Sequence, residues 1–149
     1  MADKLKVLFV CIANDARSPM AEALLRHTDD QHFEAYSAGV QPTAVDPRAI
    51  DVLEHAGIPV VGLRSKSLDE FSGQHFDYLI DLCDKSSSEE QLLPGSAEVL
   101  VWNFADPAAS MQPEAFRHAM QEIHERVKMF VMVKTRDHAQ TKTPGQGPA

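Results

Sequence analysis

The sequence predicts an α/β fold built around a mostly parallel sheet. Two observations support this fold class: four short apolar segments have the composition of buried strands, and segments with helix-capping residues and helical periodicity alternate with them. Such alternation is typical of parallel sheets, in which helices connect successive strands. The 149 residues contain no repeat and no linker. We therefore expect one domain over residues 1–135 and a disordered tail over residues 136–149, which are rich in Thr, Gln, Gly and Pro.

The predicted strands are Leu5–Val10, Phe33–Ser37, Phe76–Cys83 and Glu98–Trp102. The first helix begins near Ser18, with Pro19 in its first turn, where the missing N–H of proline costs nothing. Asp46 and Pro47 predict the start of a second helix, and Gly57 predicts its end.

Two further helices are expected after residue 60. Ser67 and Glu70 have the spacing of a capping box, which predicts a short third helix. Pro113 predicts the start of a long last helix. The apolar residues of this last helix fall on one stripe, which indicates that one face packs against the core: Phe116, Met120, Ile123, Val127 and Phe130.

Composition and charge narrow the function classes. Apolar residues make up 44% of the chain and charged residues 24%, as in ordinary soluble proteins. The formal net charge of −8 disfavours nucleic-acid binding, since phosphate backbones attract the opposite charge. The longest apolar run, Val7–Ala13, is too short to span a membrane and does not resemble a signal peptide. We therefore expect a cytoplasmic protein without membrane or nucleic-acid partners, whose two cysteines are catalytic or buried.

The most informative segment leads from the first predicted strand into the first helix. It places Cys11 at the end of the strand and Arg17 six residues later, at the start of the helix. The helix N-terminus and the Arg17 guanidinium would lower the pKa of the Cys11 thiol from its ordinary value of ~8.5, and Ser18 Oγ would donate a hydrogen bond to the sulfur. The residues that would bind the oxygens of an anion are Ile12, Ala13, Asn14, Asp15, Ala16, Arg17 and Ser18. The pattern predicts a nucleophilic thiolate at the floor of an oxyanion pocket.

A simpler interpretation is open at this point, because a buried core cysteine near an unrelated surface arginine is common. The buried strand before Cys11 and the amphipathic helix after Arg17 favour the catalytic interpretation. Cys83 stands at the end of a predicted strand, and the segment after Trp102 follows another. Because ligands bind beyond the carboxyl ends of parallel strands, we expect these segments to lie near Cys11.

Residues 10–22, VCIANDARSPMAE, resemble the signature loop of the low-molecular-weight protein tyrosine phosphatase fold. Phosphatases and thioredoxin-coupled arsenate reductases share this fold and its loop, in which a cysteine, five residues, an arginine and a serine follow one another. Asn14 matches the usual asparagine of the loop, whereas Ala13 replaces the usual glycine. The resemblance covers about residues 6–130 and implies a three-layer α/β/α fold with a central four-stranded sheet.

Two later segments resemble the reductase branch of this family. Cys83, between Leu82 and Asp84, matches the second redox cysteine, and Asp106 begins the Asp-Pro-Ala that ends the acid-bearing loop. The resemblance implies that Cys11 attacks arsenate, that Asp106 protonates the departing oxygen, and that Cys83 then forms a disulfide with Cys11 as arsenite leaves. From the residues alone, Asp106 is more simply a turn residue, and Cys83 has a strong alternative interpretation as a buried cysteine that ends a core strand.

One position departs from the reductase pattern, since Glu90 stands where the third redox cysteine would be. The resemblance then implies a shorter electron path without a bound cofactor, in which glutathione with glutaredoxin, or thioredoxin, reduces the Cys11–Cys83 disulfide. Two alternatives stay open. One is a phosphatase that hydrolyses phosphomonoesters through a phosphocysteine, and the other is a non-catalytic oxyanion-binding module that takes arsenate or phosphate.

In some relatives a potassium ion supports the loop and is held by Asn, Glu, Ser and Asp side chains. The first three correspond to Asn14, Glu22 and Ser37, and Lys66 falls at the aspartate position. The resemblance therefore implies that the Lys66 ammonium takes the place of the cation and pairs with Glu22, whereas a surface lysine is the plainer interpretation. The seven histidines show no metal-ligand spacing, so no catalytic metal is expected.

Overall fold

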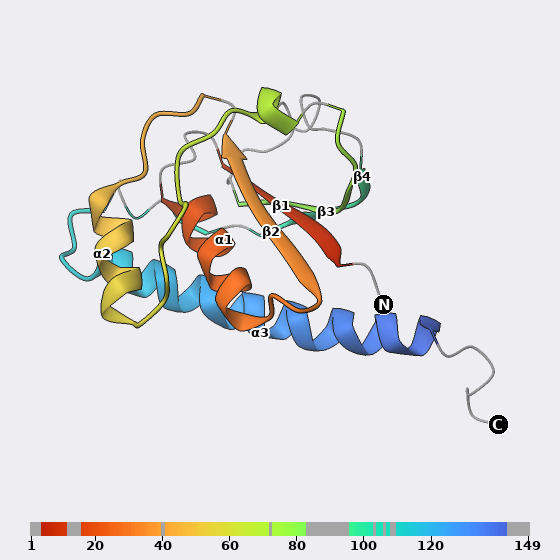
Figure 1. Cartoon of the computed structure of the whole chain (residues 1–149). Coiled ribbons are helices and arrows are strands. Elements are labelled where there is room, and N and C mark those ends of the chain that lie inside the picture. Colours follow the sequence, from red (N-terminus) through yellow and green to blue (C-terminus); the bar gives the residue numbers. More distant parts are fainter. Residues whose placement is uncertain are drawn as a thin grey trace.

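Strand β1 (Leu5–Cys11) lies inside a four-stranded sheet in the computed structural model of the chain (Figure 1). The structure describes residues 4–11, 16–39, 41–71, 73–82, 96–102, 104–105, 107 and 110–142. The sheet order is β2-β1-β3-β4, with β2 at Phe33–Gly39, β3 at Phe76–Asp81 and β4 at Ser96–Val101. All neighbouring strands are parallel, which confirms the predicted fold class.

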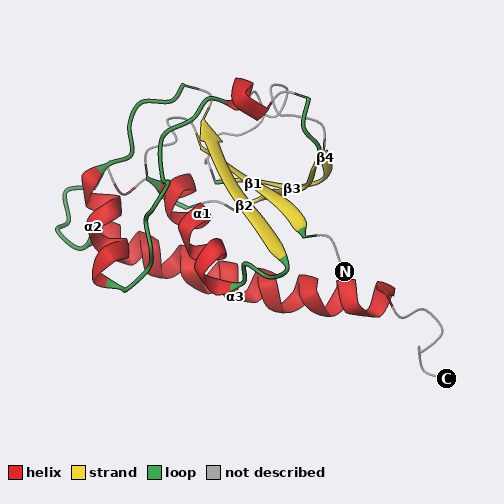
Figure 2. Cartoon of the chain, viewed as in Figure 1, coloured by secondary structure: helices red, strands yellow, loops and turns green. Residues whose placement is uncertain are grey.

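Both faces of the sheet are covered, as Figure 2 shows. Because successive residues of a strand point to opposite faces, Val7 and Phe9 of β1 enter one core cluster, whereas Leu8 and Val10 enter the other. The first cluster packs under three helices, which are α1 (Arg17–Thr28), α2 (Pro47–His55) and α3 (Ala115–Lys142). The second cluster packs under the short 3₁₀ helix η1 (Leu68–Phe71). This gives the three layers that the sequence predicts.

The sequence signals for α2 are confirmed, and a short helix follows Ser67 as predicted. Asp46 caps α2 by accepting a hydrogen bond from the Arg48 N–H at 2.9 Å, and its hydrogen bonds with Arg48 lower the pKa of its carboxyl group. Ser67 Oγ accepts from the Asp69 N–H at 3.1 Å. Glu70 pairs with Arg64, and a hydrogen bond with the Ser67 backbone also lowers the pKa of its carboxyl group. The short third helix that Ser67 and Glu70 predict is a single 3₁₀ turn.

Helix α3 extends further than the sequence predicted. Its five apolar stripe residues are all buried, as expected. The helix continues through Arg136 to Lys142, although a disordered tail was predicted from Arg136. The physical reason is that residues 136–142 contain no glycine or proline, and Pro144 is the next residue that breaks a helix.

The sheet order places the functional segment at the carboxyl end of β1. β2 and β3 lie on either side of β1, so the connections that follow the first two strands lead to opposite sides. This reversal is the topological switch point at which parallel sheets bind ligands. Cys11 is the last residue of β1 and therefore lies at this point.

Candidate functional site

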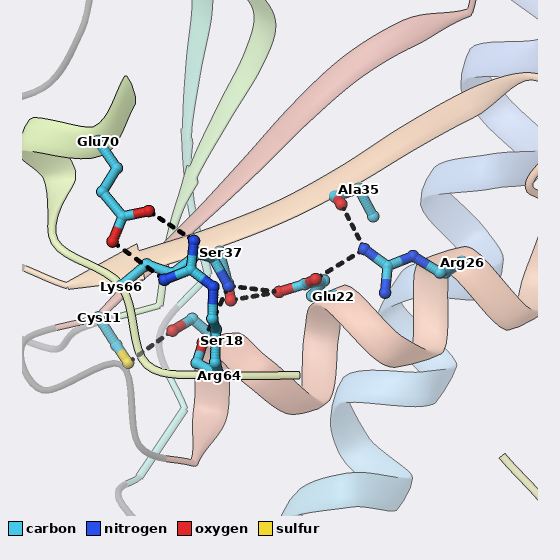
Figure 3. A network of polar contacts seen from close by, with 9 residues as sticks. All are labelled: Cys11, Ser18, Glu22, Arg26, Ala35, Ser37, Arg64, Lys66 and Glu70. Atoms are coloured by element: carbon cyan, nitrogen blue, oxygen red, sulfur yellow. Dashed lines mark hydrogen bonds and ion pairs between the residues drawn. The ribbon is translucent and has the colours of Figure 1, made fainter. Parts of the chain in front are cut away.

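Cys11 lies at the end of β1 with its side chain buried and directed toward α1. Its sulfur is 2.9 Å from Ser18 Oγ in the first turn of that helix (Figure 3). Strand alternation explains this direction, because Cys11 follows Val7 and Phe9 on the helical side of the sheet. The structure therefore brings together the predicted nucleophile and the hydroxyl group that can donate to it.

The N-terminus of α1 provides the electrostatic setting of the sulfur. Ala16 is the N-cap residue, and its carbonyl accepts the Met20 N–H at 2.9 Å. Alanine has no side chain that can cap a helix, and no side-chain cap hydrogen bond is present among the described residues. The positive end of the helix dipole is thus directed toward the Cys11 region, where it favours an anion.

Arg17 is buried and connects three parts of the chain. Its Nη1 donates to the Leu82 carbonyl at 3.3 Å and to the Phe104 carbonyl at 3.0 Å. Leu82 follows β3 directly, and Phe104 follows β4 by three residues. The predicted meeting of these strand ends near the first helix is therefore confirmed for the described residues.

Glu22 forms the centre of a buried polar cluster one helical turn behind Ser18. Its Oε1 accepts from Ser37 Oγ at 2.5 Å and lies 3.3 Å from Lys66 Nζ. Its Oε2 accepts from Arg26 Nη2 at 2.6 Å. Only 4% of the Glu22 side chain and 8% of the Lys66 side chain are exposed. The structure thus brings Glu22, Ser37 and Lys66 together beneath the start of α1 (Figure 3).

The segment that carries Lys66 is fixed on both sides. The Lys66 carbonyl accepts the Gly39 N–H at 2.8 Å, so this segment continues the sheet beyond β2. Lys66 Nζ also donates to the Arg64 carbonyl at 2.9 Å. Arg64 holds both carboxylate oxygens of Glu70, at 2.7 and 3.1 Å, and these hydrogen bonds lower the pKa of Glu70. The segment that carries Lys66 is therefore held by a backbone contact with β2 and by an exposed ion pair.

Several predicted site residues lie outside the described residues. These are Ile12, Ala13, Asn14, Asp15, Cys83 and Asp106. Sequence reasoning missed Arg26, although its position four residues after Glu22 on a predicted helix was an available signal. It also missed the pair of Arg64 and Glu70, which meet only because η1 turns the chain.

The described residues contain no group of three or more His, Cys, Asp or Glu that could hold a metal ion. Over the same residues, no helix has both the length and the apolar composition needed to cross a membrane.

Comparison with known proteins identifies one family and relatives that are arsenate reductases or tyrosine phosphatases. Residues 6–141 match the family described as low molecular weight phosphotyrosine protein phosphatase. Arsenate reductase 1 of Staphylococcus haemolyticus is 30% identical over 86% of this chain and 96% of its own length. The crystal structure of an arsenate reductase from Archaeoglobus fulgidus is 35% identical with a TM-score of 0.72, covering 84% of this chain and 98% of that one. The low molecular weight protein tyrosine phosphatase from T. tengcongensis is 25% identical with a TM-score of 0.73, covering 87% and 99%.

The family match, the all-parallel sheet and the contact between Cys11 and the first turn of α1 agree with one another. This chain belongs to the low molecular weight phosphotyrosine protein phosphatase family.

Proposed function

We propose that this protein reduces arsenate to arsenite, with Cys11 as the nucleophile. The observation that carries the proposal is the position of the Cys11 sulfur, which is buried at the switch point of the sheet and 2.9 Å from Ser18 Oγ. The similarity to arsenate reductases over most of the chain supports arsenate as the oxyanion.

In the first step, the Cys11 thiolate attacks arsenic and forms a sulfur–arsenic bond. One arsenic–oxygen bond breaks, and the departing hydroxyl group takes a proton from Asp106 and leaves as water. Arg17 and the backbone N–H groups of residues 12–16 bind the remaining oxygens, on which negative charge increases in the transition state. The Phe104 carbonyl that Arg17 contacts is two residues before Asp106, which supports this role for the acid.

In the second step, the Cys83 thiolate attacks the Cys11 sulfur. A disulfide bond forms, the sulfur–arsenic bond breaks, and its electron pair stays on arsenic. Arsenic is thereby reduced from As(V) to As(III), while two thiols are oxidised to one disulfide. The Leu82 carbonyl is held by Arg17, and Leu82 precedes Cys83 directly, which supports the approach of the second thiol.

An external thiol then completes the cycle. Glu90 stands at the position of the third redox cysteine, so we propose that glutathione with glutaredoxin, or thioredoxin, reduces the Cys11–Cys83 disulfide directly. No bound cofactor takes part. A cycle of this kind needs a compartment that keeps thiols reduced, so the proposed location is the cytoplasm.

We propose a supporting role for the buried cluster. Lys66 neutralises Glu22 beneath the start of α1, in the place where a potassium ion would otherwise act. Without this ammonium, only Arg26 would pair with Glu22, and the carboxylate would oppose the thiolate of Cys11 more strongly, because like charges disfavour each other in a buried environment. Asn14, Glu22, Ser37 and Lys66 together would support the oxyanion loop.

A phosphatase is the second candidate function. The family description and the resemblance to a tyrosine phosphatase favour it, as does Glu90 at the position of the third cysteine. Cys11, Arg17 and Asp106 would keep the same roles, and water would hydrolyse a phosphocysteine. Cys83 would then take no part in turnover.

One experiment separates the two candidates. Arsenite release is measured from arsenate with glutathione and glutaredoxin, or with thioredoxin, and hydrolysis of p-nitrophenyl phosphate is measured in parallel. We expect arsenite release by the wild type, loss of both activities in Cys11→Ser, and loss of arsenite release alone in Cys83→Ser. Arsenite release that survives in Cys83→Ser would rule out the two-cysteine path. Fast hydrolysis without arsenite release would establish the phosphatase.

A further inference from the structure

The C-terminal half of α3 has one face on the body of the protein and one face in solvent. On the inner side, Val127 and Phe130 are buried, and Lys134 lies 3.9 Å from Glu98 of β4 and over the Tyr78 ring. Figure 1 shows that this part of α3 lies along the lower side of the molecule and that its end extends beyond the sheet. The outer side of the helix is therefore accessible along its length.

The outer side carries an apolar group that nothing in the described part of the chain covers. Met129, Met132 and Val133 are 59%, 56% and 49% exposed. Single exposed apolar side chains are ordinary, but three large ones within five residues of one helix form a patch. The patch is bounded by Glu125 at one end and by Arg136 at the other, both exposed.

The four residues Glu125, Met129, Met132 and Arg136 form one stripe, which we call the outer stripe of α3. Their spacing of four, three and four residues places them on one side of an α-helix. The stripe is self-complementary. If a second copy of α3 lies antiparallel across it, with a two-fold axis between the methionines, each Met129 meets the Met132 of the other copy. The same axis brings each Glu125 to the Arg136 of the other copy.

We propose that the outer stripe of α3 is the contact surface of a symmetric dimer of this chain. A two-fold contact uses the same patch on both copies, which requires the self-complementarity that this stripe has. An anionic lipid surface offers no positive group to Glu125 beyond Lys128 of the same helix, which lies 2.9 Å from that carboxylate. An acidic protein partner would leave the same carboxylate unmatched. A second copy brings an oppositely charged side chain to each end of the stripe.

The size of the stripe sets the strength of the dimer. One pair of helix faces buries less than the roughly 800 Å² per partner of a standard interface. The net charge of −8 also opposes association of two copies at long range. The dimer is therefore weak and reversible, and its population rises with protein concentration. This inference is independent of the proposed function, because the outer stripe contains none of the proposed catalytic residues.

Sedimentation velocity of the full chain tests the proposal, at protein concentrations from about 10 μM to about 1 mM. We expect the sedimentation coefficient to rise toward that of a dimer. Glu125→Arg and Arg136→Glu should each raise the dissociation constant by roughly tenfold or more, because each change replaces two attractive pairs by two repulsive ones. The double variant Glu125→Arg with Arg136→Glu should restore dimerisation, since the charges then match again.

Glu114→Arg is the matched control, because Glu114 directly precedes α3 and pairs with Arg117 outside the stripe. It should leave association unchanged. A monomer at every concentration would overturn the proposal, and so would a double variant that associates no better than the single ones. Association that requires anionic vesicles would also overturn it. Phosphate binding at the Cys11 site is measured on the same variants, and we expect it to stay unchanged.

Discussion

Lys66 and Glu22 form a buried ion pair, with Lys66 Nζ 3.3 Å from Glu22 Oε1. The chain also contains an exposed pair of the same charge types, between Arg64 and Glu70 at 2.7 Å. Arg64, Lys66 and Glu70 lie within one short segment, whereas Glu22 lies on α1, and the two pairs differ strongly in exposure. Removing one partner of a buried pair leaves the other charge buried, without a partner or solvent, and this lowers the free energy of unfolding. An exposed pair contributes little to that free energy. Matched substitutions in the two pairs therefore measure how much more the buried pair contributes to stability.

Lys66→Met should lower the free energy of unfolding by about 3 kcal/mol, at the low end of the range for a broken buried pair, because Arg26 still contacts Glu22. It should also raise the pKa of the Cys11 thiol. Denaturant unfolding measures the first effect, and the pH dependence of iodoacetamide alkylation measures the second. Arg64→Met is the control and should cost at most about 1 kcal/mol. Equal effects of the two substitutions would contradict the role of Lys66.

Potassium should not activate the wild-type protein. The Lys66 ammonium lies against Glu22 and donates to the Arg64 carbonyl, so the place beside the carboxylate already holds a positive charge. Arsenate reduction is measured while potassium replaces sodium at constant ionic strength. Strong activation by potassium would show that a metal cation, and not Lys66, supports the loop.

Ser18→Ala should raise the pKa of the Cys11 thiol. The reason is the loss of the hydrogen bond between Ser18 Oγ and the sulfur, since a hydrogen bond to a charged group contributes about 1.5–3 kcal/mol. Alkylation near neutral pH should slow accordingly. Ser67→Ala removes a hydroxyl that accepts from the Asp69 N–H instead and should leave the alkylation profile unchanged. An unchanged profile in Ser18→Ala would contradict the assignment of this serine.

Arg17→Lys should loosen the ends of β3 and β4 as well as weaken oxyanion binding. Lysine keeps the charge but cannot reach two carbonyls and an oxyanion together. Amide exchange at Leu82 and Trp102, which donate to Val10 and Asp81, should accelerate about fivefold, the equivalent of one hydrogen bond of about 1 kcal/mol. Hydrogen exchange followed by NMR measures this effect.

The internal reference for this exchange experiment is the Gly39 amide, which donates to the Lys66 carbonyl and should not change. Affinity for phosphate should fall by roughly tenfold or more, because a bidentate contact is lost. Unchanged exchange at Leu82 and Trp102 would mean that Arg17 does not hold these strand ends.

The sequence predicted the parts of the site that depend on local patterns. Cys11 and Ser18 are seven residues apart, and a strand that leads into a helix brings them together without help from the rest of the chain. The stripe from Phe116 to Phe130 likewise follows from helical periodicity alone. Lys66 was placed beside Glu22 only through the resemblance to a known family, since no local pattern connects residues 44 positions apart.

The parts that could not be predicted depend on tertiary contacts. The contacts of Arg17 are with backbone carbonyls, and every residue has a carbonyl, so no residue type marks Leu82 or Phe104 as partners. Glu70 matched a capping box in the sequence, but in the structure Arg64 competes for its carboxylate. Arg64 is only six residues from Glu70, but no helical or strand periodicity connects these two positions.

The contacts of Arg17 also bear on how the protein matures during synthesis. Its carbonyl partners lie 65 and 87 residues further along the chain, whereas the serine beside the thiol is only seven residues from it. Because the ribosome releases the N-terminal part first, a nascent chain can bring Cys11 and Ser18 together long before Phe104 exists. Arg17 reaches its final position only when four strands have been made. The surroundings of the Cys11 thiol are therefore completed late, when almost the whole domain has been made.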